Sequence, residues 1–216
     1  MCTNYVITKD KLNDEIFRFI CTAAMRDAVI QLAYKGKKKP LMASEVLDSI
    51  KDKIEFLIDN VLNDTYTSQE NYDRDFLDTT INISEFINKK VGNEEFTFGN
   101  AQKLLNIILK YLYIISYKND GLQKNFRFCH CPMDQRLLED VWKKRAESCI
   151  KEDQIDLRNR NYFLKSWGNE NFEGDGNPGN AFPERYMLFQ KAVRCLASKE
   201  GRNPLEYDYH IWDSAT

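Results

Sequence analysis

The sequence contains little glycine, proline or histidine, and it has no long hydrophobic run. Its 216 residues include 9 glycines, 5 prolines and 2 histidines. The most apolar stretch, residues 104–117, is interrupted by Asn106 and Lys110 and is too short to span a bilayer. The N-terminal residues also lack the apolar centre of a secretory signal peptide. We therefore predict a cytoplasmic protein with no membrane partner.

No charge of one sign dominates the chain. The formal net charge is −2 and the pI is about 5.8, so bulk charge does not favour nucleic acid or an acidic membrane surface. The 31 lysines and arginines are still enough to build a local basic face. With 43% apolar and 30% charged residues, the composition is that of a globular protein rather than a disordered one.

The six cysteines do not have the spacing of a disulfide framework in a secreted protein. Four of them, Cys2, Cys21, Cys149 and Cys195, are isolated in the sequence. A cysteine without a neighbouring partner is most often a small buried thiol. We predict that most of these four are buried thiols.

Hydrophobic periodicity predicts helices and almost no strand. The expected helices cover residues 12–34, 41–62, 84–90, 98–117 and 183–201, with one more beginning near Pro132. Ser84 is the expected N-cap of the short third helix, Gly92 is expected to stop it, and Gly201 is expected to terminate the helix that starts at Pro183. Residues 63–75 are polar and aperiodic and are predicted to be a linker or an irregular crossover, and residues 168–183 are predicted to be a loop. The fold class predicted from this pattern is all-α, a single-domain orthogonal helical bundle with long irregular loops. An N-terminal helical subregion over 1–62 and a core over 84–216 would divide it.

The stretch "FRFCHCPMDQRLLEDV", residues 126–141, concentrates unusual residue types. Cys129, His130 and Cys131 are adjacent, so their side chains point in different directions and do not converge on one metal ion. We predict no metal and no cofactor there, and a tight turn whose thiols pack inward. Pro132 suits the first turn of a helix, and Asp134 would lie where the helix dipole favours a carboxylate.

Lys103, Asn106 and Lys110 recur at helical spacing and form one polar stripe on the otherwise apolar helix over 98–117. This stripe faces either water or a polar cleft. Lys103 and Asp134 both lie near helix N-termini that can meet at one cleft. There a lysine can act as a nucleophilic amine and a carboxylate can stabilise a cationic sugar. Asn106, Lys110 and Arg136 are the candidate phosphate contacts. The alternative is an exposed Lys103 and a purely capping Asp134.

The segments "FTFGNAQKLLNIILKYLYI" and "FCHCPMDQRLLEDV" resemble the core of helix-hairpin-helix base-excision DNA glycosylases of the oxoguanine-glycosylase type. The resemblance implies an all-helical fold in which Lys103 matches the lysine that attacks C1′ of a flipped nucleotide, and Asp134 matches the family's aspartate. The family hairpin carries two glycines separated by one residue, and only Gly99 stands here. A lysine-bearing helix followed by "HCPxD" also resembles a group of bacterial proteins.

Two functions follow as expectations. The first is a DNA glycosylase-like protein that binds DNA or a nucleotide, with Lys103 and Asp134 as catalytic residues if it is a glycosylase/lyase. The second is a non-enzymatic helical module that binds a protein or has a regulatory role. That module would use an exposed aromatic patch at Tyr207, Tyr209 and Trp212.

Overall fold

The computed structural model describes residues 14–29, 41–92, 95–116, 120–145, 149 and 182–213. These ranges contain helices and no strand, which confirms the all-α class. The elements are α1 (Asp14–Ala28), α3 (Ala43–Leu62), α4 (Gln69–Val91), α5 (Phe98–Ile115), α6 (Asp120–Gln123), the 3-10 turn η3 (Lys124–Phe126), α7 (Gln135–Lys143), α9 (Phe182–Lys199) and α10 (Pro204–Asp213). Each helix in these ranges is too short or too polar to cross a membrane. The predictions for residues 30–34 and 168–181 lie outside the described residues.

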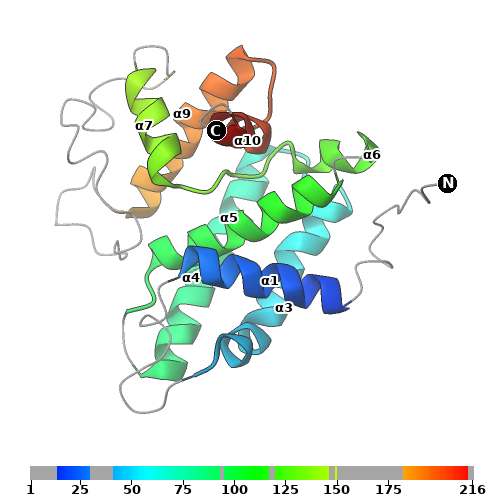
Figure 1. Cartoon of the computed structure of the whole chain (residues 1–216), viewed down its shortest axis with the longest axis vertical. Coiled ribbons are helices and arrows are strands. Elements are labelled where there is room, and N and C mark those ends of the chain that lie inside the picture. Colours follow the sequence, from blue (N-terminus) through cyan, green and yellow to red (C-terminus); the bar gives the residue numbers. More distant parts are fainter. Residues whose placement is uncertain are drawn as a thin grey trace.

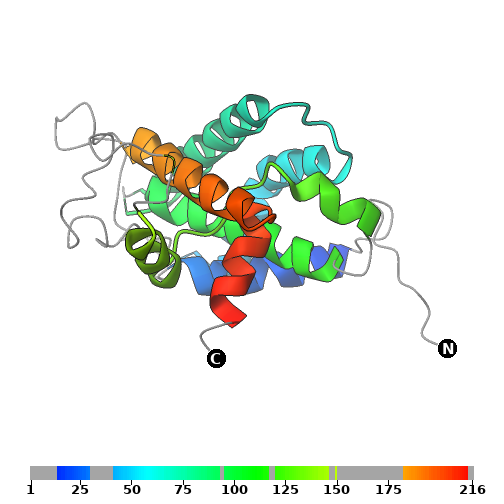
Figure 2. The same ribbon diagram turned by 90° about the horizontal axis from the view of Figure 1, so that it is seen from above.

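Helix α5 crosses the middle of the molecule, between α1 and α4 (Figures 1 and 2). Its sequence is apolar on most sides, and most of its side chains are buried, as predicted for a central helix. Thr97 and Asn100 cap its start reciprocally, since each side chain accepts a hydrogen bond from the other residue's backbone N–H. Helices α7, α9 and α10 pack together at one end of the bundle.

Helix α4 is longer than the sequence pattern indicated. Residues 63–75 were predicted to be a linker or an irregular crossover, and Ser84 to be a helix N-cap. The first prediction is confirmed for residues 63–68 and wrong for 69–75, and the second is wrong. The helix begins at Gln69, with the Ser68 hydroxyl accepting from the Asn71 N–H at 3.3 Å. Ser84 lies buried inside the helix and donates to the Phe96 carbonyl at 2.6 Å. The helical spacing was hidden because hydroxyl and aromatic residues, rather than aliphatic ones, form much of the buried face. These residues are Tyr72, Phe76, Thr79 and Thr80.

Two glycines end helices as expected from the sequence. Gly92 follows α4 with φ of +70°, and Gly201 follows α9 with φ of +67°. Both values lie in the left-handed region that glycine adopts without strain. Helix α7, by contrast, begins later than predicted. Gln135 is its first residue, so Pro132 precedes the helix and Asp134 is its N-cap rather than part of its first turn.

A single hydrophobic core links the helices of both predicted subregions. Buried residues of α1 and α3 belong to the same cluster as those of α4, α5, α7, α9 and α10. Cys149 and Cys195 form a disulfide with their Cα atoms 5.8 Å apart, so the expectation of free thiols is wrong for this pair. Cys21 is a buried free thiol, as predicted. Because disulfides are uncommon in reducing compartments, this bond counts against the cytoplasmic location, which stays a prediction.

Candidate functional site

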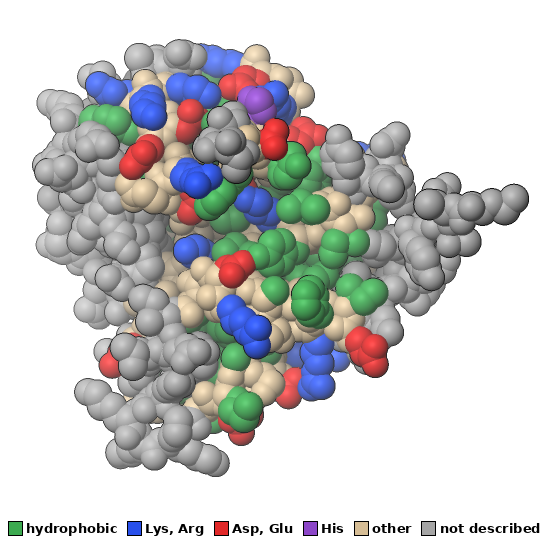
Figure 3. Space-filling model, in the orientation of Figure 1, with side chains coloured by type: hydrophobic (Ala, Val, Ile, Leu, Met, Phe, Trp, Pro, Cys, Tyr) green, Lys and Arg blue, Asp and Glu red, His purple; other side chains and the backbone are tan. Residues whose placement is uncertain are grey.

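A pocket of about 730 Å³ lies where α5, the start of α7 and the end of α10 meet α1. Its charged and aromatic lining residues are Asp27, Lys103, Lys110, Tyr111, Asp134, Arg136 and Trp212. Figure 3 shows lysine and arginine side chains spread over the face of the molecule that carries α5, α7 and α10. Four of the five residues selected from the sequence therefore line one pocket.

Asn106 is the selected residue that does not line the pocket. Its side chain is buried in the core, with the amide nitrogen donating to Gln102 Oε1 at 3.0 Å and to the Tyr186 hydroxyl at 2.8 Å. The polar stripe of α5 thus faces two environments, because Lys103 and Lys110 reach the pocket while Asn106 faces α9. We therefore withdraw Asn106 from the candidate ligand contacts.

Asp134 has a structural role in this pocket. Its Oδ1 accepts from the Leu137 backbone N–H at 2.9 Å, which caps α7. Its Oδ2 accepts from the indole N–H of Trp212 at 2.8 Å. Both carboxylate oxygens have partners, so the capping alternative raised by the sequence is confirmed as one role of this residue.

Lys110 forms a buried ion pair. Its ammonium lies 2.6 Å from Asp208 Oδ2, and the Asp208 side chain is 0% exposed. Burial raises the pKa of Asp208 to about 6, although the nearby Lys110 ammonium acts in the opposite direction. Lys110 also lies 5.4 Å from the centre of the Trp212 ring. Its charge is therefore largely neutralised inside the protein and contributes less to the pocket than its position suggests.

Lys103 and Arg136 are the cations of the pocket that remain available. Among the described residues, the Lys103 amine makes no hydrogen bond or ion pair, and its side chain is partly exposed. The Arg136 guanidinium lies 4.1 Å from the centre of the Trp212 ring. Its side chain is exposed and makes no hydrogen bond or ion pair with the described residues, so its N–H donors can still bind a ligand. Gly99 lies buried in the first turn of α5, so we assign its backbone no phosphate contact.

The Cys129–Cys131 turn packs inward. Burial raises the pKa of the Cys129 thiol to about 12 and also raises that of Cys131, which makes neither a nucleophile. Within the described ranges, no group of three His, Cys, Asp or Glu residues is placed to hold a metal ion. His130 lies in the core, and desolvation lowers its pKa even though Asp73 favours the charged form.

His130 belongs to a buried hydrogen-bond network that sequence analysis missed. Its Nε2 lies 2.8 Å from Asp73 Oδ1, and its Nδ1 lies 3.0 Å from the Tyr186 hydroxyl. Tyr186 is fully buried, so the network reaches solvent only near Asp73, beside Arg194. Asp73 was assigned to a linker. The signal that identifies its helix is Ser68 followed by an acidic residue in the first turn, Glu70.

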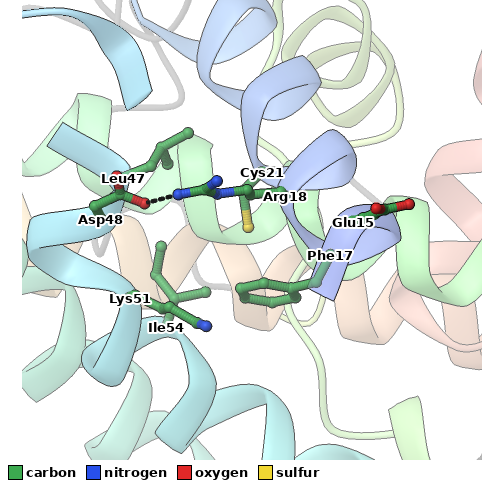
Figure 4. Close-up of a pocket in the computed structure, with 8 residues that line it drawn as sticks. All are labelled: Glu15, Phe17, Arg18, Cys21, Leu47, Asp48, Lys51 and Ile54. Atoms are coloured by element: carbon green, nitrogen blue, oxygen red, sulfur yellow. Dashed lines mark hydrogen bonds and ion pairs between the residues drawn. The ribbon is translucent and has the colours of Figure 1, made fainter. Parts of the chain in front are cut away.

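A second pocket lies between α1 and α3 (Figure 4). An ion pair between Arg18 and Asp48, 2.8 Å long and largely exposed, bridges the two helices there. Phe17 and Ile54 are apolar walls, and burial raises the pKa of the Cys21 thiol to about 12. Because its thiol is protonated and Arg18 is paired with Asp48, we assign this pocket no chemistry.

The chain matches no protein-family model, no curated protein and no solved structure.

Proposed function

We propose that the pocket between α5, α7 and α10 binds a phosphate-bearing ligand of nucleotide size, with Lys103 and Arg136 as the phosphate contacts. The observation that carries this proposal is that the pocket's carboxylates accept hydrogen bonds from the protein, whereas Lys103 and Arg136 have no such partner among the described residues. Asp27 accepts a hydrogen bond from the Tyr111 hydroxyl, and Asp134 caps α7. Lys103 and Arg136, in contrast, make no hydrogen bond or ion pair with any residue that the structure describes, and both are cations, which matches an anionic ligand.

The shape of the site favours a nucleotide over a long stretch of duplex DNA. Small-molecule pockets commonly enclose about 300–1,000 Å³, and this pocket encloses about 730 Å³. Binding to duplex DNA draws on many lysine and arginine contacts, whereas the net charge of this chain is −2. A free nucleotide, or a single nucleotide of a nucleic-acid strand, needs only the local pair of cations.

Isothermal titration calorimetry of the full chain with AMP, GMP and UMP at low salt tests the proposal. We expect K103A and R136A each to weaken binding about tenfold, because each removes a charge-assisted hydrogen bond to phosphate. K143A is the matched control, since Lys143 is an exposed cation on α7 outside the pocket. No binding by the wild type, or equal weakening by K143A, would refute the proposal.

A stronger form of the proposal follows the glycosylase resemblance. The Lys103 amine would add to C1′ of an open-chain abasic sugar and lose water to give an imine. Borohydride would then reduce the imine to a stable amine. This form is favoured by the position of the Lys103 amine at the pocket, where it has no partner in the described part of the chain. An adduct with abasic DNA that K103A abolishes and K143A retains would support it. Retained nucleotide binding without any adduct would leave binding as the whole function.

A further inference from the structure

Trp212 makes three polar contacts through one ring. Its indole N–H donates to Asp134 Oδ2 at 2.8 Å, the Arg136 guanidinium lies 4.1 Å from the ring centre, and the Lys110 ammonium lies 5.4 Å from it. The side chain is nevertheless 39% exposed and comes from the last turn of α10. The indole is therefore held by pocket residues rather than by the hydrophobic core.

These contacts are the ones that proteins use to hold a nucleobase. An arginine plane stacks on the face of the base, and a side-chain acceptor takes the N–H donors at its edge. Asp134 and Arg136 both belong to the start of α7. The backbone N–H of Leu137 fixes the Asp134 carboxylate independently of Trp212. The pair would therefore keep its arrangement if another planar ring replaced the indole.

Helix α10 is most deeply buried at its start, and in its last turn Ile211 packs partly against the core while the neighbouring Trp212 reaches the surface. Leu205, Tyr207 and Asp208 near its start are buried, whereas Tyr209 and Trp212 are exposed to 51% and 39%. The predicted aromatic patch is thus divided, because Tyr207 belongs to the core and the other two reach the surface. Displacing Trp212 would break the contacts with the pocket and leave the buried start of α10 in place.

We infer that Asp134 and Arg136 form a nucleobase subsite, specific for guanine, which the Trp212 indole occupies in this structure. Guanine presents two adjacent N–H donors, N1–H and the N2 amine, and Asp134 Oδ2 is the acceptor that the indole would leave for them while Oδ1 caps α7. Adenine and cytosine have a ring nitrogen with a lone pair beside the amine. The negatively charged carboxylate would repel this lone pair, which disfavours both bases. The inference rests on the proposed function, and it adds the base to the phosphate contacts of Lys103 and Arg136.

Calorimetry with GMP, IMP and AMP tests this subsite. We expect W212A to bind GMP at least about fivefold more tightly than the wild type, because the base no longer competes with the indole. We expect D134N to lose the preference for GMP over AMP. Asparagine still caps α7, but it can present an amide donor in place of the Oδ2 acceptor. IMP, which lacks the N2 amine, should bind between the two. Y209A is the control, an exposed aromatic change on the same helix.

A second readout separates displacement from stacking. Acrylamide quenching of the Trp212 emission, taken as the difference between wild type and W212F, should increase when GMP binds. Weaker GMP binding by W212A, or reduced quenching with GMP, would show that Trp212 is a stacking platform and overturn the inference. That result would not affect the proposed function, which is tested separately by the binding measurements on K103A and R136A. Absence of nucleotide binding in every variant would overturn both.

Discussion

Replacing Asp208 with asparagine should stabilise the protein at neutral pH and not at acidic pH. The Asp208 carboxyl is fully buried beside Lys110, and burial raises its pKa from the ordinary 3.8 to about 6. A carboxyl with a raised pKa binds its proton more tightly in the folded state than in the unfolded state. Its ionisation therefore lowers stability as pH rises from about 4 to about 6, and this loss is complete above that range.

The magnitude follows from the two pKa values. At about 1.36 kcal/mol for each pH unit between them, ionised Asp208 costs the folded state about 3 kcal/mol. D208N removes this cost at about pH 7.5, whereas at about pH 4 it replaces a neutral carboxylic acid with a neutral amide of similar shape. The change in unfolding free energy caused by D208N should therefore be about 3 kcal/mol more favourable at the higher pH.

Urea unfolding followed by circular dichroism at both pH values measures this difference. D78N removes the same formal charge from an exposed position on α4 and controls for net charge. If D208N has the same effect at both pH values, or is less favourable at the higher one, then the Lys110 ion pair outweighs the cost of burial. That result would refute the conclusion that burying ionised Asp208 destabilises the folded state.

Three further changes test contacts that hold the site in place. Y186F removes the hydroxyl that joins Asn106 to His130, and urea unfolding should show a loss of about 1–3 kcal/mol because buried polar groups lose their partner. A loss within error of zero would mean that water replaces the hydroxyl. D134A should cost about 1 kcal/mol through loss of the α7 cap and D134N much less, so equal losses would contradict the capping role. C149S should lower the unfolding free energy by about 2–4 kcal/mol, and a reductant should do the same to the wild type and not to the variant.

The candidate site was only partly predictable from the sequence. Lys103 and Lys110 were selected because seven residues place them on one helix face, and Asp134 because a carboxylate suits a helix start. The structure brings these residues to one pocket. Asn106 lies between them at helical spacing, on the same predicted face, but its side chain points to the core, toward Tyr186 on α9. Spacing defines a face of α5, but it does not specify where along that face the neighbouring helix begins to cover it.

The all-α class, the central position of α5 and the glycine ends of α4 and α9 could be predicted from the sequence, because helical periodicity and left-handed caps are local properties of the chain. The partner of each polar group could not, because it depends on how the helices pack. Asp208 pairs with Lys110, Asp73 with His130, and Cys149 with Cys195. The two residues of each pair are at least 46 positions apart in the sequence, so the pattern of neighbouring residues cannot reveal their contact.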